Sequence, residues 1–251
     1  MSLHALWNTL LYEPFVNALA ALVSLLPGGD VGLAVIILTL LVKIILYPLS
    51  QRAIESQAQM GLVAPEINKI KNSGASKEEQ ARLTFELYRK HKINPFSGCL
   101  IQIPVIIVII ALYSVFLKGV NFDASVLYSF VPEPEKIGTF FLGMVDVTTK
   151  SLPLAIIAGI TQYLQAHYMP KPQEQPAGAG NTFQESFSKS MHVQMKYVFP
   201  FVVGFFAYTI SGAIALYLIT SNIFAIGQQI YAKKKDPLVI EALKKDEKRA
   251  N

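Results

Sequence analysis

Long apolar stretches alternate along the chain with charged or turn-forming stretches, and this pattern predicts helices that cross a membrane. The first clear stretch, residues 31–50, reads VGLAVIILTLLVKIILYPLS and has the roughly 20 residues that a spanning helix needs. Further apolar stretches occupy 94–117, 151–169 and 195–232, and a turn at Ser211-Gly212 divides the last of these into two spans. The sequence therefore predicts an all-α polytopic membrane protein with five transmembrane helices.

The segments beside the spans have compositions of their own. Residues 1–30 are apolar but interrupted by polar residues, which predicts an amphipathic helix in the outer membrane interface, with an additional span as the alternative. Residues 118–150 form an outer loop with apolar patches, and residues 170–194 form a cytoplasmic loop rich in Pro, Gly, Gln and Ser. Residues 233–251 form a charged, mostly basic tail.

Residues 51–93 are charged and have helical periodicity. A break at Asn72–Gly74 divides them into two arms, and Ser76 with Glu79 three residues later predicts a capped start of the second arm. We expect a helical hairpin outside the membrane with too few apolar positions for a strong core. Both a mobile docking element and a solvated connector fit this pattern.

The distribution of Lys and Arg predicts the orientation. Eight lie in 51–93, three in 170–196 and seven in the tail, whereas residues 1–30 hold none and 118–150 hold three. By the positive-inside rule, the hairpin and the tail are cytoplasmic and the N-terminus is outside. The net charge of +5 thus reflects membrane orientation and not nucleic-acid binding.

Composition narrows the class of protein. Hydrophobic residues make up 52% of the 251 residues and charged residues only 16%, with a mean hydropathy of +0.40. The single cysteine excludes an internal disulfide, and the four histidines have no spacing typical of metal ligands. HExxH, GxSxG and GxxxxGK motifs are absent, so we expect no enzyme, no cofactor and no metal. The N-terminal residues lack the features of a presequence, which favours a bacterial plasma membrane.

Polar residues inside the spans are the candidate functional residues. Lys43 lies deep in the first span, where a charge costs at least about 2.5 kcal/mol and must snorkel, pair or face water. No acid in any span is available to neutralise it, which suggests a wet cavity of positive potential. The other candidates are hydroxyls and amides, for which simple interhelical hydrogen bonding is the alternative. They are Thr39, Gln102, Thr161, Gln162, Gln165, Thr220, Ser221, Asn222 and Gln228.

Several stretches together resemble the YidC/Oxa/Alb family of membrane protein insertases. The most specific are LYRKHKINPFSGC (87–99), at the junction of hairpin and second span, and LYLITSNIFAIGQQ (216–229) in the last span. Weaker matches are VKIILYPLSQRAIES around Lys43, APEINKIK in the hairpin and ITQYLQAHYM in the third span. In the hairpin the matching positions are Pro65, Glu66, Tyr88 and Lys90.

The resemblance implies a hydrophilic groove open to the cytoplasm and the lipid but closed to the outside. A basic residue of the first span, usually arginine in bacterial members, aligns with Lys43, and lysine lacks the bidentate fork of arginine. The implied function is insertion of nascent hydrophobic segments into the bilayer without nucleotide hydrolysis. The implied partners are nascent membrane proteins and lipid, with a Sec translocon and ribosomes as further candidates.

Two other functions fit the same residues. A small-molecule or ion transporter could use Lys43 in its pathway, although the internal repeats common in transporters are missing. A chaperone or assembly factor for membrane proteins would share the groove and could coexist with insertion.

Overall fold

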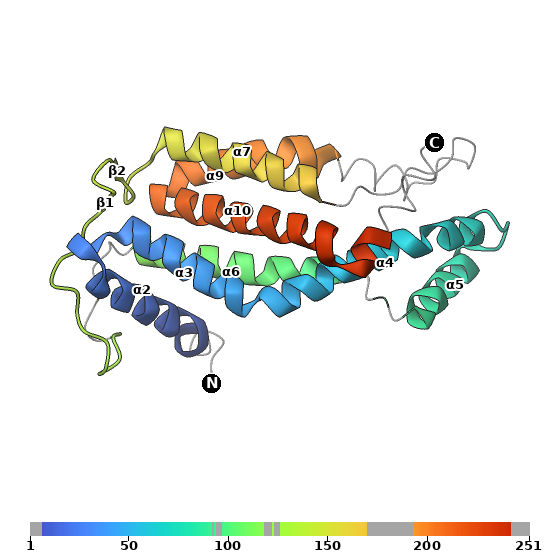
Figure 1. The fold of residues 1–251 in the computed structure, drawn as a ribbon, viewed down its shortest axis with the longest axis horizontal. Helices are drawn as coiled ribbons and strands as arrows, with labels where there is room; N and C mark the ends of the chain where they lie inside the picture. Colours follow the sequence, from blue (N-terminus) through green and yellow to red (C-terminus); the bar gives the residue numbers. More distant parts are fainter. Residues whose placement is uncertain are drawn as a thin grey trace.

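The protein is an elongated bundle of helices with a helical hairpin at one end and a small β-hairpin at the other (Figure 1). The computed structural model describes residues 7–91, 93, 97–117, 122, 126–169 and 193–241. Its principal helices are α2 (Glu13–Leu25), α3 (Val31–Ile45), α4 (Tyr47–Lys71), α5 (Lys77–Lys90), α6 (Ser97–Leu117), α7 (Leu152–Tyr168), α9 (Phe199–Ile210) and α10 (Gly212–Lys235). π-Helical turns at Asn8–Tyr12 and Gln194–Val198 precede α2 and α9, and a 3-10 turn at Pro27–Gly29 precedes α3.

The residues predicted to form the first span, 31–50, are divided between two helices. α3 ends at Ile45, and after Leu46 the chain continues as α4 at an angle of 60° to α3. Pro48 stands in the first turn of α4, where proline is tolerated, and its missing N–H and rigid ring disfavour an uninterrupted helix through this point.

The hairpin itself consists of α4 and α5. The Ser76 side chain accepts a hydrogen bond from the Glu79 N–H, which confirms the predicted cap. The Glu79 carboxylate, however, binds Arg82 at 2.6 Å on the same helix. A small apolar cluster of Val63, Leu87 and Ile93 joins the two arms, and most of α5 is exposed.

At the opposite end, residues 126–149 fold over the starts of α3 and α10. They include the two-stranded antiparallel hairpin of β1 (Phe140–Phe141) and β2 (Val145–Asp146), which the sequence pattern did not predict. The first N–H groups of α10 donate to this loop, from Gly212 to the Thr149 carbonyl and from Ala213 to the Val147 carbonyl, each at 2.8 Å. These bonds satisfy helix-terminal donors that would otherwise lack a partner.

One large apolar core runs through the bundle and joins α2 to the other helices. Leu19 of α2, Val35 of α3, Leu112 of α6 and Ile214 of α10 are all nearly fully buried within it. α7 and α9 pack at close range, because Gly159 and Gly204 leave room for the facing backbone. One face of the predicted N-terminal helix is thus buried against the bundle.

Five membrane spans remain a prediction. Within the described residues, α10 alone is long and apolar enough to cross a bilayer, and α3 with α4 meets the same test only as a bent pair. Shorter apolar helical stretches occupy Ile106–Phe116 and Lys196–Ile210, and α7 has 17 residues. Short spans require a thinned bilayer or close packing against neighbouring helices.

Candidate functional site

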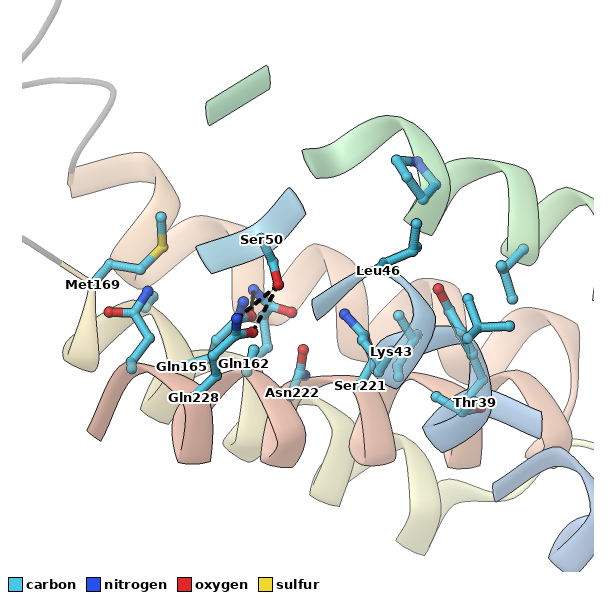
Figure 2. A pocket seen from close by; sticks show the side chains of 18 of the residues that line it. Thr39, Lys43, Leu46, Ser50, Gln162, Gln165, Met169, Ser221, Asn222 and Gln228 are labelled. Atoms are coloured by element: carbon cyan, nitrogen blue, oxygen red, sulfur yellow. Dashed lines mark hydrogen bonds between the residues drawn. The ribbon is translucent and has the colours of Figure 1, made fainter. Parts of the chain in front are cut away.

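A cavity of about 210 Å³ lies among α3, α4, α6, α7, α9 and α10, on the hairpin side of the bundle. Counted as the volume open to the centre of a water molecule, one water needs about 10–15 Å³, so the cavity can hold on the order of ten waters. Figure 2 shows the side chains that face one another across it. Seven of the ten predicted groove residues line it: Thr39, Lys43, Gln162, Gln165, Ser221, Asn222 and Gln228.

Lys43 reaches the cavity from the last turn of α3, three residues before the break at Leu46 (Figure 2). It is the one charged residue among the described residues that line the space. Within the described part of the chain, its ammonium has no carboxylate within ion-pair distance. Its place at a helix C-terminus favours a cation, because the helix dipole is negative there. The cavity therefore combines one positive charge with neutral polar walls.

Amide and hydroxyl groups form the end of the cavity nearest the hairpin. Gln228 Nε2 donates to Ser50 Oγ at 2.7 Å, and the Ser50 hydroxyl can donate to Gln228 Oε1 or to the Tyr47 carbonyl, each at 3.0 Å. On α7, Gln162 Nε2 donates to Gln165 Oε1 at 3.1 Å. Each amide has further donors or acceptors beyond these bonds, so the wall can exchange partners with water or polypeptide.

Two predicted groove residues, Thr161 and Thr220, do not line the cavity, and the side chain of a third, Gln102, is outside the described residues. Thr161 is buried behind the wall and accepts a hydrogen bond from Asn222 Nδ2 at 3.3 Å, so it positions a lining residue. Thr220 donates to the Leu216 carbonyl of its own helix at 2.8 Å. Gln102 belongs to α6, and its side chain lies outside the described set.

Sequence reasoning left out two polar lining residues. Ser50 and Gln57 on α4 line the cavity. Because the spacing of seven between Ser50 and Gln57 puts both on one face of a helix, the signal was present in the sequence. Gln57 falls in the segment 51–93 that we predict to lie outside the membrane, and Ser50 is the last residue of the predicted first span.

The four hairpin residues predicted by resemblance lie away from the cavity. Pro65 stands inside α4, and Glu66 beside it is 3.8 Å from the His91 ring at the end of α5. Tyr88 packs against the small hairpin cluster, and burial raises the pKa of its hydroxyl. Lys90 is exposed. Their functional role stays a prediction.

Among the described residues, no group of three His, Cys, Asp or Glu side chains lies close enough together to hold a metal ion. Apolar residues also line the cavity, among them Val108, Val203 and Leu218, which belong to the main core or pack against it. The site can therefore hydrate or bind a polar segment, and its apolar walls suit a neighbouring hydrophobic one.

Comparison with known proteins places these features in context. The profile of a family described as 60Kd inner membrane protein matches residues 23–238. A protein named membrane protein insertase YidC from Fusobacterium nucleatum is 31% identical over 82% of this chain and 88% of its own length. One of the same name from Clostridium tetani is 30% identical over 90% of this chain and 93% of its own length. A third relative, also named membrane protein insertase YidC and from Anaeromyxobacter, is 32% identical over 83% of this chain. The match covers only 33% of that relative's own length.

Proposed function

The chain belongs to the 60Kd inner membrane protein family, and on that premise we propose that it is a membrane protein insertase of the bacterial inner membrane. The observation that carries the proposal is the cavity lined by Lys43, amides and hydroxyls, which reaches toward one end of the bundle while a loop covers the other. A substrate with a polar and an apolar part needs a polar cavity that is accessible from one side of the membrane and lies beside lipid.

The first step is entry of the polar flank of a nascent segment into the cavity. Moving an unpaired peptide group from water into an apolar medium costs about 2–7 kcal/mol, and this cost is the main barrier to translocation. Side chains such as Gln165, Ser221 and Asn222 replace part of the lost hydration. Lys43 adds a positive potential that favours acidic flanks.

The second step is release of the apolar segment into lipid. Exposed apolar side chains on α7, among them Ile156, Ile160 and Leu164, and Ile223 on α10 provide a surface along which it can leave. Burial of apolar area in lipid yields about 25 cal/mol per Å² and drives this step without nucleotide hydrolysis. For charged flanks, the membrane potential adds about 2.3 kcal/mol per charge at 100 mV.

The orientation follows from charge and shape together. The basic hairpin and the end of α10 lie at one end of the bundle, and the β-hairpin with the start of α3 lies at the other (Figure 1). We therefore place the hairpin and the tail in the cytoplasm and the N-terminus outside. Nascent membrane proteins and lipid are the proposed partners, and a Sec translocon or a ribosome would meet the cytoplasmic end.

An insertion assay in cells depleted of their own insertase tests the proposal. The substrate is a single-span protein with an acidic outer tail, and the chain is expressed as wild type, Lys43→Arg, Lys43→Ala and Lys43→Glu at matched levels. Wild type and Lys43→Arg should restore insertion, whereas Lys43→Ala should reduce it roughly tenfold, equivalent to about 1.4 kcal/mol. Failure of wild type would contradict insertase function, and equal rescue by all four would contradict the role of the charge.

The transporter alternative is separated in proteoliposomes. Flux of small anions without any polypeptide substrate, abolished by Lys43→Ala, would favour transport over insertion.

A further inference from the structure

The start of α4 is bonded to the chain just beyond the end of α10, outside the cavity. Gln51 Nε2 donates to Asp236 Oδ2 at 2.8 Å, across 185 positions of sequence. The other carboxylate oxygen of Asp236 accepts from the Leu238 N–H at 2.9 Å, which orders the turn that follows. One carboxylate therefore joins the tail segment 236–241 to the first turns of α4.

Apolar contacts reinforce this junction. Ile54 and Ala58 of α4 form a buried cluster with Ala232 of α10 and Val239 of the tail segment. This cluster is separate from the main core of the bundle. The junction is thus a small independent contact that can open while the bundle stays folded.

The position of the junction relates it to the cavity. Ser50, Ile54 and Gln57 line the cavity from α4, and Gln51, Ile54 and Ala58 form the adjacent contact face of the same helix. α4 joins α3 through the single residue Leu46, at a bend of 60°. Rotation of α4 about Leu46 would therefore move one wall of the cavity, and the junction holds that wall in place.

The closed junction also contains an unsatisfied group. Gln51 Oε1 is buried and has no hydrogen-bond partner among the described residues. The amide cannot turn over to satisfy it, because Oε1 would then face the Asp236 carboxylate. A buried acceptor without a partner costs free energy, and this cost is relieved when the junction opens and the group is hydrated.

We propose that Gln51 and Asp236 form a latch that holds α4 against the end of α10 and so sets the width of the cavity mouth. Asp236 is a positioning residue: it acts on the cavity through α4 and does not line it. The inference rests on the proposed function, since an opened latch would admit the polar flank of a substrate.

The first test measures access to the cavity without any substrate. The full chain is purified in detergent with Cys99→Ser and a probe cysteine at Ala166, a buried residue that lines the cavity, and its alkylation by a maleimide is timed. Asp236→Ala or Gln51→Ala should each accelerate alkylation about fivefold. The double variant should be no faster than Asp236→Ala alone, because both substitutions remove the same bond between Gln51 and Asp236.

Matched variants separate the latch from general loosening. Asp236→Asn keeps an oxygen that can accept from Gln51 and should stay near the wild-type rate, as should Glu241→Ala, which removes an exposed acid of the same segment. A probe cysteine at the fully buried Ala20 of α2 should stay unreactive in every variant. The latch would be overturned if the alkylation rate at position 166 were unchanged in both alanine variants. It would also be overturned if the two single effects multiplied in the double variant, or if alkylation at position 20 were accelerated equally.

The second test measures insertion with the latch locked. In the Cys99→Ser background, cysteines replacing Gln51 and Asp236 are joined by a short bismaleimide, and insertion should fall at least fivefold relative to the same variant before crosslinking. Insertion that survives the crosslink would overturn the latch. If the uncrosslinked protein and wild type both fail to insert, the proposed function fails, while the alkylation result still decides the latch.

Discussion

The two ends of the bundle are built in different ways. At the β-hairpin end, backbone bonds hold the chain together, from Val31 N–H to the Gly138 carbonyl and from Gly138 N–H to the Gly29 carbonyl. The Asp30 side chain adds one bond, which it accepts from the Leu142 N–H. At the α4–α5 end, the Ser50 and Gln228 side chains bond to each other across the cavity, and Gln162 bonds to Gln165 along α7. Backbone bonds fix one geometry, whereas amide side chains can exchange partners. The difference suits an end that stays closed and an end that admits a guest.

The largest effect is expected at the closed end, on substitution of Gly29 by alanine. Gly29 has a φ of +67°, and a Cβ there would overlap the Lys136 carbonyl. We expect Gly29→Ala to cost about 3–5 kcal/mol, from the left-handed backbone and the overlap together. Gly28 has a similar φ of +70° but open space around it, so Gly28→Ala should cost only about 1–2 kcal/mol. Thermal unfolding in detergent measures both, and equal losses would show that the close approach to Lys136 is unimportant.

A smaller loss is expected for Asn17→Leu, which removes the tie between α2 and the loop. Asn17 Nδ2 donates to the Val126 carbonyl at 2.9 Å, and Oδ1 accepts from the Tyr128 N–H at 2.6 Å. Leaving these loop groups unpaired should cost about 2–4 kcal/mol. Ser24→Ala removes a more exposed bond to the same loop and should cost less than about 1 kcal/mol. Hydrogen exchange at Tyr128 should accelerate in Asn17→Leu alone, and an unchanged rate would contradict this role.

At the cavity end, Gln228→Met should affect stability little and insertion more. Gln228 faces a space that water can enter, so the loss of its bond to Ser50 should cost less than about 1 kcal/mol of folding free energy. Insertion of a substrate with a polar flank should slow severalfold, because the wall loses an amide. If Gln228→Met lowered the unfolding temperature strongly and left insertion unchanged, Gln228 would serve stability and not the substrate, which would contradict the contrast between the two ends.

The smallest effect concerns the α4–α5 hairpin at high pH. Burial raises the pKa of Tyr88 above its ordinary value of 10.0, so the folded state holds the proton more tightly than the unfolded state does. Its contribution to stability is therefore complete below pH 10 and is lost as the pH rises through the folded pKa. The difference in phenolate absorbance between wild type and Tyr88→Phe, followed against pH, should show a midpoint above 10. A midpoint at or below 10 would contradict the burial.

The sequence predicted much of the cavity end but little of the closed end. Periodicity and composition placed Lys43 with amides of the third and last spans, because polar side chains in apolar helices must face the protein interior. The bonds from Gly29 and Asp30 to residues 138 and 142 join segments more than a hundred positions apart, and no local pattern reveals them. The break at Leu46 had a local signal in Pro48, but proline is also tolerated inside membrane helices.

The central claim is that a substrate's polar flank enters the cavity end and never reaches the closed end from within the bundle. A photoreactive amino acid at Met169, which lines the cavity, is compared with one at Leu142, an exposed residue of the β-hairpin, during stalled insertion of a single-span substrate. We expect crosslinks from the substrate flank to position 169 and none to position 142 while the flank is still engaged. Crosslinks confined to position 142, or equal crosslinking at both positions, would contradict it.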